Sequence, residues 1–199
     1  LFAAFASFYV LFTGGHIYTP DGVLMFQVTE ALVENGSVEI PGLGGGLGTV
    51  YVADPGTGRQ RAYSWYGLAY SLAAVPGYLL GGLLEPLATA CDRTLLDTPA
   101  TRQGRQRTLD PAPTTWDDQR SHRTLYYDTT APSFGLAFRA FTASLTNAFI
   151  AAGAVVLVFS IGLRLGGGTR ASLLAACAAG LGTLLWHYAQ TFFSEPLAA

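Results

Sequence analysis

The sequence predicts an all-α, polytopic membrane protein whose transmembrane helices are joined by an outer loop containing juxtamembrane helices. Half of the 199 residues are hydrophobic and only 12% are charged. The mean hydropathy is +0.34, which is high for a soluble domain of this size. Apolar runs at 140–163 and 171–189 each approach the ~20 residues that a helix needs to cross the hydrocarbon core of a bilayer.

The expected elements follow from these runs and from the polar segments between them. A first transmembrane helix, truncated at its start, covers 1–16, and an outer loop with juxtamembrane helices covers 17–135, including a polar insert at 85–132. The second transmembrane helix covers 136–165, the third covers 170–190, and 191–199 form an outer loop and the start of a next helix.

The orientation follows from the short loop between the second and third helices. Arg164 and Arg170 lie in this loop, and short loops rich in arginine usually stay in the cytoplasm. The loop at 17–135 and the segment after 190 are therefore expected on the opposite, outer face.

A further apolar run at 66–84 is long enough to cross the membrane, but Pro76, Gly77, Gly81 and Gly82 interrupt it. If this run crossed, the loop with the two arginines would face outside unless the polar insert hid another crossing. A re-entrant or interfacial helix therefore fits better than a fourth span.

Residues 21–35 show the spacing of an amphipathic helix. Polar side chains recur at Gln27, Glu30 and Glu34, and apolar residues occupy the opposite side. Gly36 marks its end. We expect a juxtamembrane helix that rests in the membrane interface, the alternative being a helix packed within the loop.

Charge and cysteine content exclude some partners and leave others open. The 11 basic residues are all arginine and the net charge is only -2, so no nucleic-acid partner is expected. Cys91 and Cys177 form neither a disulfide framework nor a metal motif. The glycine-rich stretch at 42–48 lacks the ending of a P-loop, and 53–58 has the composition of a turn.

Asp21 follows the first apolar run and begins the predicted juxtamembrane helix. An aspartate at this position has two interpretations. It is a helix N-cap, which accepts hydrogen bonds from backbone N–H groups, or it is a catalytic carboxylate at the membrane surface.

The order of features resembles the glycosyltransferase C superfamily. A span, Asp21, an amphipathic helix ending at Asn35-Gly36, the Ile40-Pro41 step, a glycine-rich stretch and Tyr63-Ser64-Trp65-Tyr66-Gly67 follow one another. The chain is most similar to the branch that uses lipid-phosphate sugars, which includes protein O-mannosyltransferases and aminoarabinose transferases. Gly22 stands where many relatives carry a second acidic residue, so the resemblance does not assign the subfamily.

The resemblance implies an inverting glycosyltransferase of the cell membrane that transfers a hexosyl or pentosyl group from a polyprenyl-phosphate-linked donor. Its multi-pass chain would place the active site on the outer, periplasmic or extracellular face. Asp21 would be the catalytic base. Substrate-binding candidates are Glu195 after the third span, Arg61 toward the leaving phosphate, Tyr66 and His187.

Several questions stay open at this level. The sugar, the acceptor and the lipid carrier are not assigned, and a divalent metal ion stays open as a cofactor. The partners expected are the lipid-linked donor, membrane lipid and an unidentified acceptor. The alternative is a non-catalytic polytopic membrane protein, such as a transporter subunit or assembly factor, in which Asp21 caps a helix and Glu195 faces water.

Overall fold

The computed structural model describes residues 1–13, 17, 20–40, 48–95 and 134–192. Most of these residues are helical, as predicted, but a small sheet is also present. The chain divides into two compact units. The helical unit comprises Leu1–Gly15 and Ser144–Ala199, and the mixed unit comprises His16–Ala143.

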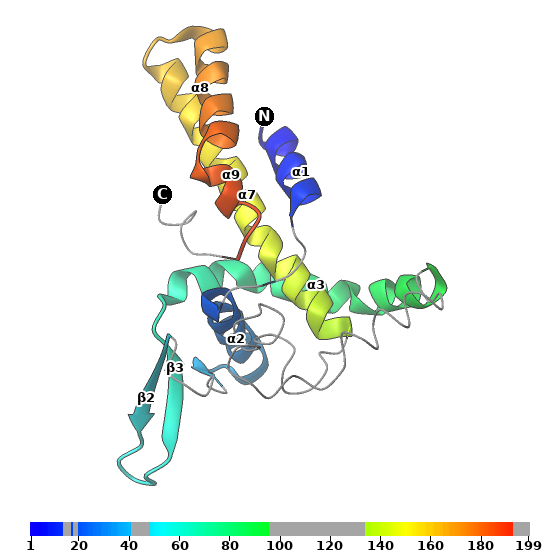
Figure 1. Cartoon of the computed structure of the whole chain (residues 1–199), viewed down its shortest axis with the longest axis vertical. Helices are drawn as coiled ribbons and strands as arrows, with labels where there is room; N and C mark the ends of the chain where they lie inside the picture. The colour runs from blue at the N-terminus through cyan, green and yellow to red at the C-terminus, as the bar shows by residue number, and fades with distance from the viewer. Residues whose placement is uncertain (14–16, 18–19, 41–47, 96–133, 193–199) are drawn as a thin grey trace, which may run out of the picture. The chain divides into compact units, whose positions relative to one another are not determined.

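The helical unit is built from α1 (Phe2–Phe12), most of α7 (Phe134–Arg164), α8 (Gly168–Gly182) and α9 (Leu184–Tyr188). Helices α7 and α8 lie side by side and run in opposite directions (Figure 1). Small residues of α7 at positions 148, 151, 152 and 155 recur at helical spacing and pack with Phe5 and Tyr9 of α1. The Tyr9 hydroxyl donates a 2.8 Å hydrogen bond to the carbonyl of Gly180.

The predicted helix at 136–165 is confirmed as α7, but the helix predicted at 170–190 is not continuous. Helix α8 ends at Gly182, and Thr183 has an extended backbone before α9 begins. The Thr183 side chain accepts a hydrogen bond from the N–H of Leu185, so it serves as the N-cap of α9. An apolar run of suitable length therefore contains a break that its hydropathy did not reveal.

The mixed unit contains α2 (Pro20–Asn35), a three-stranded sheet and α3 (Leu68–Leu95). The helix predicted at 21–35 is confirmed as α2. It begins at Pro20, whose missing N–H is no loss at the first helical position. It ends before Gly36, whose φ of 60° is the left-handed conformation that favours glycine.

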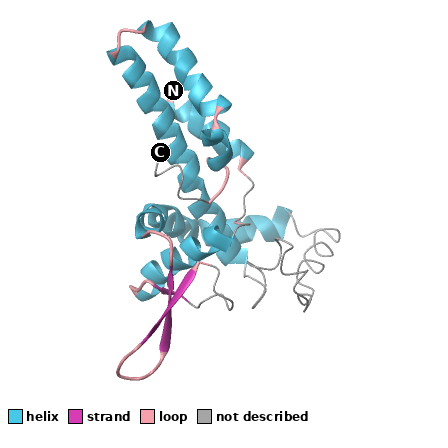
Figure 2. Ribbon diagram, turned by 60° about the vertical axis from the view of Figure 1, so that its left-hand side comes forward, coloured by secondary structure: helices cyan, strands magenta, loops and turns pink. Residues whose placement is uncertain are grey.

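The sheet corrects the all-α prediction. Strands β1 (Glu39–Ile40), β2 (Thr49–Ala53) and β3 (Gln60–Ser64) pair antiparallel in the order β1-β3-β2. Strands β2 and β3 form a projecting hairpin, drawn in magenta in Figure 2. In its register Tyr51 pairs with Ala62. The predicted turn at 53–58 is confirmed as the connection of this hairpin.

Helix α3 is continuous where the sequence indicated an interrupted helix, and its placement as a re-entrant or interfacial helix stays a prediction. It runs from Leu68 to Leu95 without a break at Pro76 or at the glycines that follow. Gly77 lies against the backbone of α7, where an added Cβ would be 2.7 Å from the Thr142 carbonyl oxygen. The glycine thus permits a close approach of the two helices.

Helix α2 has its apolar side covered within the mixed unit, rather than open to a membrane interface. Leu24 and Val28 pack with Ile40 and Ala62 of the sheet. On another side Phe26 meets the Tyr78 ring of α3, with ring centroids 5.7 Å apart. The alternative of a helix packed within the loop therefore describes α2 better.

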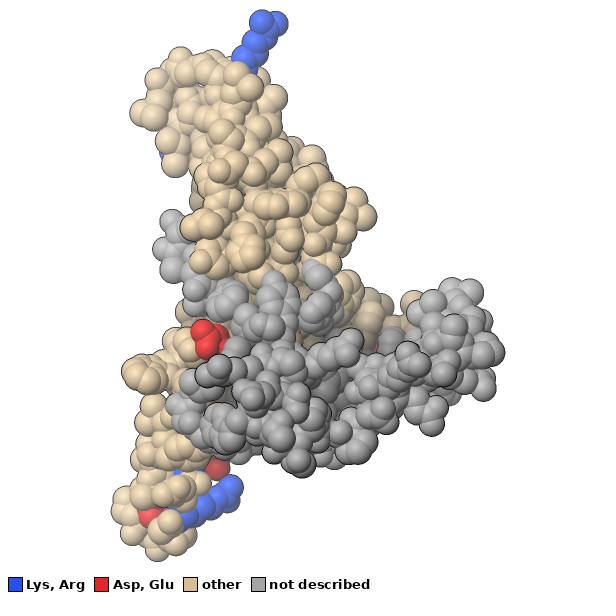
Figure 3. Space-filling view, in the orientation of Figure 1, with Lys and Arg blue, Asp and Glu red and all other residues tan. Residues whose placement is uncertain are grey.

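Hydropathy and exposure identify the surface that is compatible with lipid. Two helical segments, Leu68–Cys91 and Phe138–Arg164, are long and apolar enough to cross a membrane, which weakly suggests a membrane location. On the face shown in Figure 3, the surface of α7 and α8 is almost uncharged apart from a basic side chain at the tip of their hairpin. Helix α3 also exposes a row of leucines: Leu68, Leu72, Leu79, Leu83 and Leu87.

Candidate functional site

Asp21 lies in the first turn of α2, one residue after the helix begins. Asp21 is therefore not the N-cap itself. As a carboxylate in the first turn, it interacts favourably with the positive end of the helix dipole. Its side chain is partly exposed, and no described residue forms a hydrogen bond or an ion pair with it.

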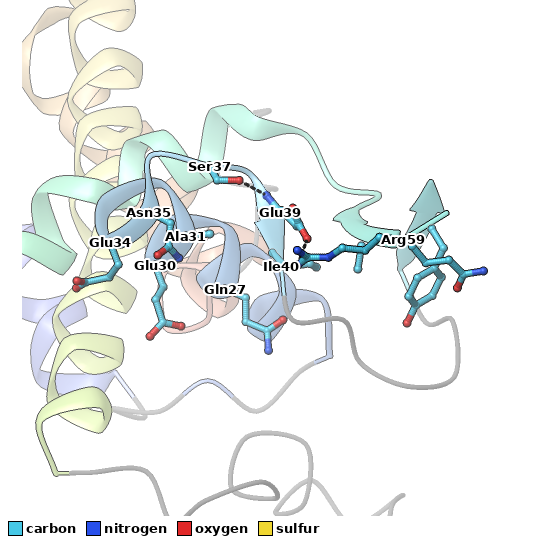
Figure 4. A pocket seen from close by; sticks show the side chains of 12 residues that line it. Gln27, Glu30, Ala31, Glu34, Asn35, Ser37, Glu39, Ile40 and Arg59 are labelled. Atoms are coloured by element: carbon cyan, nitrogen blue, oxygen red, sulfur yellow. Dashed lines mark hydrogen bonds and ion pairs between the residues drawn. The ribbon is translucent and has the colours of Figure 1, made fainter. Parts of the chain in front are cut away.

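An open groove with a volume of about 670 Å³ lies between α2 and the sheet. Figure 4 shows Gln27, Glu30 and Glu34 reaching from α2, while Glu39 comes from β1 and Arg59 approaches it. The remaining lining residues are Ala31, Asn35, Ser37, Ile40, Tyr51, Gln60 and Ala62. The predicted polar face of α2 is thus confirmed, and it forms one wall of this groove.

Two polar side chains of the groove lack partners among the described residues. Burial raises the pKa of Glu30, the nearby charge of Glu34 raises it further, and Arg139 opposes these effects. Glu30 forms no hydrogen bond or ion pair with a described residue. The Oε1 atom of Gln27 is buried without a hydrogen-bond partner. Such an acceptor costs about 1–3 kcal/mol when it is left unsatisfied.

Arg139 joins three elements of the mixed unit. Its Nη1 donates to Glu34 Oε1 at 2.7 Å, and its Nε donates to Glu85 Oε2 at 3.1 Å. The Tyr78 hydroxyl donates to the same Glu34 oxygen at 3.0 Å, and the guanidinium lies 5.3 Å from the Tyr78 ring centroid. Arg139 is therefore held by two carboxylates.

The structure places Arg61 and Tyr66 at different points of the mixed unit. Arg61 lies on β3, and its Nη2 donates to Asp54 Oδ2 at 2.9 Å on the exposed hairpin. The bond to Asp54 raises the pKa of Arg61. Tyr66 packs against the cluster that contains Leu24 and Val28. Neither residue lines the groove, and neither is in hydrogen-bond contact with Asp21.

His187 and Glu195 belong to the helical unit. His187 is exposed on α9, and its ring lies 5.6 Å from that of Tyr188. Glu195 lies outside the described residues. The roles expected for Glu195 and His187 in substrate binding thus stay predictions. Within the described ranges, no group of three His, Cys, Asp or Glu side chains is arranged to hold a metal ion.

Comparisons of the chain with protein-family models, with curated proteins and with solved structures found no match.

Sequence reasoning missed the groove because it missed the sheet. The signal was present in the first of its paired strands: Thr49–Ala53 is rich in β-branched and aromatic residues, and a segment with Pro55 and two glycines follows it. The periodicity of 21–35 did place Glu30 and Glu34 on one face of a helix. Which residues cover that face depends on contacts between segments that are distant in the sequence.

Proposed function

We propose that this protein is a membrane glycosyltransferase that takes a sugar from a polyprenyl-phosphate-linked donor and uses Asp21 as its catalytic base. The observation that carries the proposal is the position of Asp21. It follows the apolar helix α1, occupies the first turn of α2 and is not engaged by any described side chain. A base must be accessible to the acceptor, and this carboxylate is partly exposed.

The order of elements supports the same proposal. Along the sequence, α1 and α7 flank a segment that contains α2, the sheet and α3. This order is expected for an outer loop that carries juxtamembrane helices. Arg164 ends α7 and Arg170 lies near the start of α8. With this turn in the cytoplasm, Asp21 would lie on the outer face of the membrane.

In the proposed reaction, the Asp21 carboxylate accepts the proton of an acceptor hydroxyl. The acceptor oxygen then attacks the anomeric carbon from the face opposite the lipid phosphate. The bond between this carbon and the phosphate oxygen breaks, and the lipid phosphate leaves with the bonding electron pair, so the configuration inverts. Each atom and charge is thereby accounted for with no further reactant.

The departing phosphate needs a cationic partner, and Arg61 is the candidate. Its ion pair with Asp54 is exposed, with side-chain exposures of 46% and 22%. Exposed ion pairs contribute only about 0–1 kcal/mol, so a phosphate can compete for this guanidinium. Arg139 is a weaker candidate because Glu34 and Glu85 both hold it.

The test is transfer of a labelled sugar from polyprenyl-phosphate donors to membrane acceptors in proteoliposomes. The Asp21→Asn variant is expected to lose about 10²–10⁴-fold in kcat because the amide cannot accept the proton. The control is Thr169→Ala, at an exposed position near the start of α8, which should keep most of the activity.

Unfolding curves of the two variants and of the parent protein separate loss of catalysis from loss of folding. Equal activity of the parent protein and Asp21→Asn would remove Asp21 from the chemistry. Absence of transfer from every donor would favour the non-catalytic alternative, in which Asp21 only stabilises the start of α2.

A further inference from the structure

The groove between α2 and the sheet presents hydrogen-bond acceptors that the protein itself does not satisfy. Gln27 Oε1 is buried without a partner, and the Glu30 carboxylate bonds to no described residue. In Figure 4 both side chains extend from the same side of α2. A ligand with O–H or N–H groups would supply the missing donors once the Gln27 amide turns about its last side-chain bond.

The charge of the lining restricts the ligand further. Among the described lining residues are three carboxylates, those of Glu30, Glu34 and Glu39, and one basic side chain, that of Arg59. The guanidinium of Arg59 is already 3.0 Å from Glu39 Oε1. An excess of negative charge attracts cations, repels phosphate groups and does not repel neutral molecules. The groove is thus unsuited to the phosphate of a lipid-linked donor.

The size and the remaining lining match a small polar ligand. A volume of about 670 Å³ lies within the range of small-molecule sites. Tyr51 adds an aromatic surface, and Asn35, Ser37 and Gln60 add polar groups. Amide, hydroxyl and carboxylate groups beside an aromatic ring provide both the hydrogen bonds and the apolar contact that a sugar ring requires.

We propose that this groove binds a phosphate-free carbohydrate or amino sugar, held by Gln27 and Glu30, as the part of the acceptor that lies away from the hydroxyl deprotonated by Asp21. The assignment of the ligand as the acceptor rests on the proposed function. The preference for a phosphate-free sugar rests only on the groove.

The test uses the full chain in lipid nanodiscs at low ionic strength, with binding followed by saturation-transfer NMR titrations. Matched probe pairs are glucose with glucose 6-phosphate, and glucosamine with glucosamine 6-phosphate. Each phosphate-free sugar is expected to bind saturably, and its phosphate to bind at least about tenfold more weakly because of like-charge repulsion. Equal or tighter binding of the phosphates would overturn the proposal, as would no saturable binding of either phosphate-free sugar.

Two variants test whether the phosphate-free sugars bind in the groove. Gln27→Ala and Glu30→Ala should each weaken binding of the phosphate-free sugars by about tenfold, which corresponds to the loss of one or two hydrogen bonds. Thr169→Ala, in the helical unit and outside the groove lining, should leave it unchanged. Unaltered binding in both groove variants would place the ligand elsewhere and overturn the proposal.

The experiments distinguish failure of the sugar-binding groove from failure of the transferase assignment. Asp21→Asn should retain sugar binding even though it loses transfer, because Asp21 is not part of the groove lining. Saturable, Glu30-dependent binding in a protein that transfers no sugar would support the groove and contradict the transferase assignment. Transfer activity without sugar binding in the groove would support the transferase assignment and contradict the groove proposal.

Discussion

Arg139 Nη1 on α7 lies 2.7 Å from Glu34 Oε1 on α2, although the two residues are 105 positions apart in the sequence. Glu85 Oε2 on α3 accepts a second hydrogen bond from the same guanidinium, at 3.1 Å. One side chain therefore ties together three helices of the mixed unit. The exposed fractions are 29% for the Arg139 side chain and 48% for that of Glu34, so the pair is partly shielded from water.

The Arg139→Gln variant should destabilise the protein by about 1–3 kcal/mol, because it leaves two partly buried carboxylates beside each other without their cation. The Arg59→Gln variant, which breaks an exposed pair with Glu39, should cost about 0–1 kcal/mol. Urea unfolding in detergent micelles measures both. Equal costs for the two variants would contradict the role assigned to Arg139.

The Gly77→Ala variant should destabilise the packing of α3 on α7 by about 1–3 kcal/mol, since a methyl group there would meet the Thr142 carbonyl oxygen at 2.7 Å. Gly153→Ala is the matched control, because no atom lies within 4 Å of the added methyl group. Alanine is the better helix former, so this control should be neutral or slightly stabilising. A destabilisation of similar size in both variants, seen by thermal unfolding, would exclude close packing as the cause.

The β2–β3 hairpin should lose protection in acid. The backbone N–H of Gly56 and then the Arg61 guanidinium lower the pKa of Asp54. A lowered pKa in the folded state contributes stability above the ordinary value of the carboxyl, and this stability is lost as the pH falls through the lowered pKa. Amide exchange of the hairpin should therefore accelerate relative to that of α7 below about pH 4. Asp54→Asn should abolish this difference, and an unchanged difference in that variant would assign the pH dependence to another group.

Asn147 fixes the chain that follows α9. Its Nδ2 donates to the carbonyl oxygens of Tyr188 at 3.2 Å and Thr191 at 2.6 Å. Asn147→Leu keeps a similar volume but leaves both carbonyls without this donor, and a cost of about 1–3 kcal/mol is expected. Hydrogen exchange should rise at 189–192 and stay unchanged in the mixed unit. A uniform rise over the whole chain would instead indicate global destabilisation.

Helix α3 should lie along the membrane surface with its leucine row toward lipid, and both of its ends on one side. Glu34 of α2 contacts Tyr78 near the middle of α3, with its side chain 48% exposed. If α3 crossed the bilayer, this carboxylate would lie in hydrocarbon at a cost of about 2.5–3.5 kcal/mol.

Cysteine labelling on sealed vesicles tests this placement. An impermeant maleimide should reach Cys91 and a Pro55→Cys variant from the same face, and a Leu165→Cys variant from the opposite face. Each protein carries that single cysteine, with the others replaced by serine. Labelling of Cys91 together with Leu165→Cys, and apart from Pro55→Cys, would show that α3 crosses.

The sequence by itself determined the elements whose signal is local. Helices α2 and α7 were found where periodicity and an apolar run predicted them, and the turn at 53–58 follows from its proline and glycines. The position of Asp21 at the start of α2 was also predicted, because its place after an apolar run and at a helix start needs no tertiary contact. These features depend on neighbours a few residues away.

The tertiary structure decided what covers these elements. The continuity of α3 through Pro76, the break of the last apolar run at Gly182 and the second wall of the groove were not evident from hydropathy. Hydropathy measures tolerance for an apolar environment, but not whether the backbone ladder continues or which strand pairs with which. The contact of Arg139 with Glu34 likewise arises only when distant helices pack, because its energy depends on a distance between side chains that the local sequence does not encode.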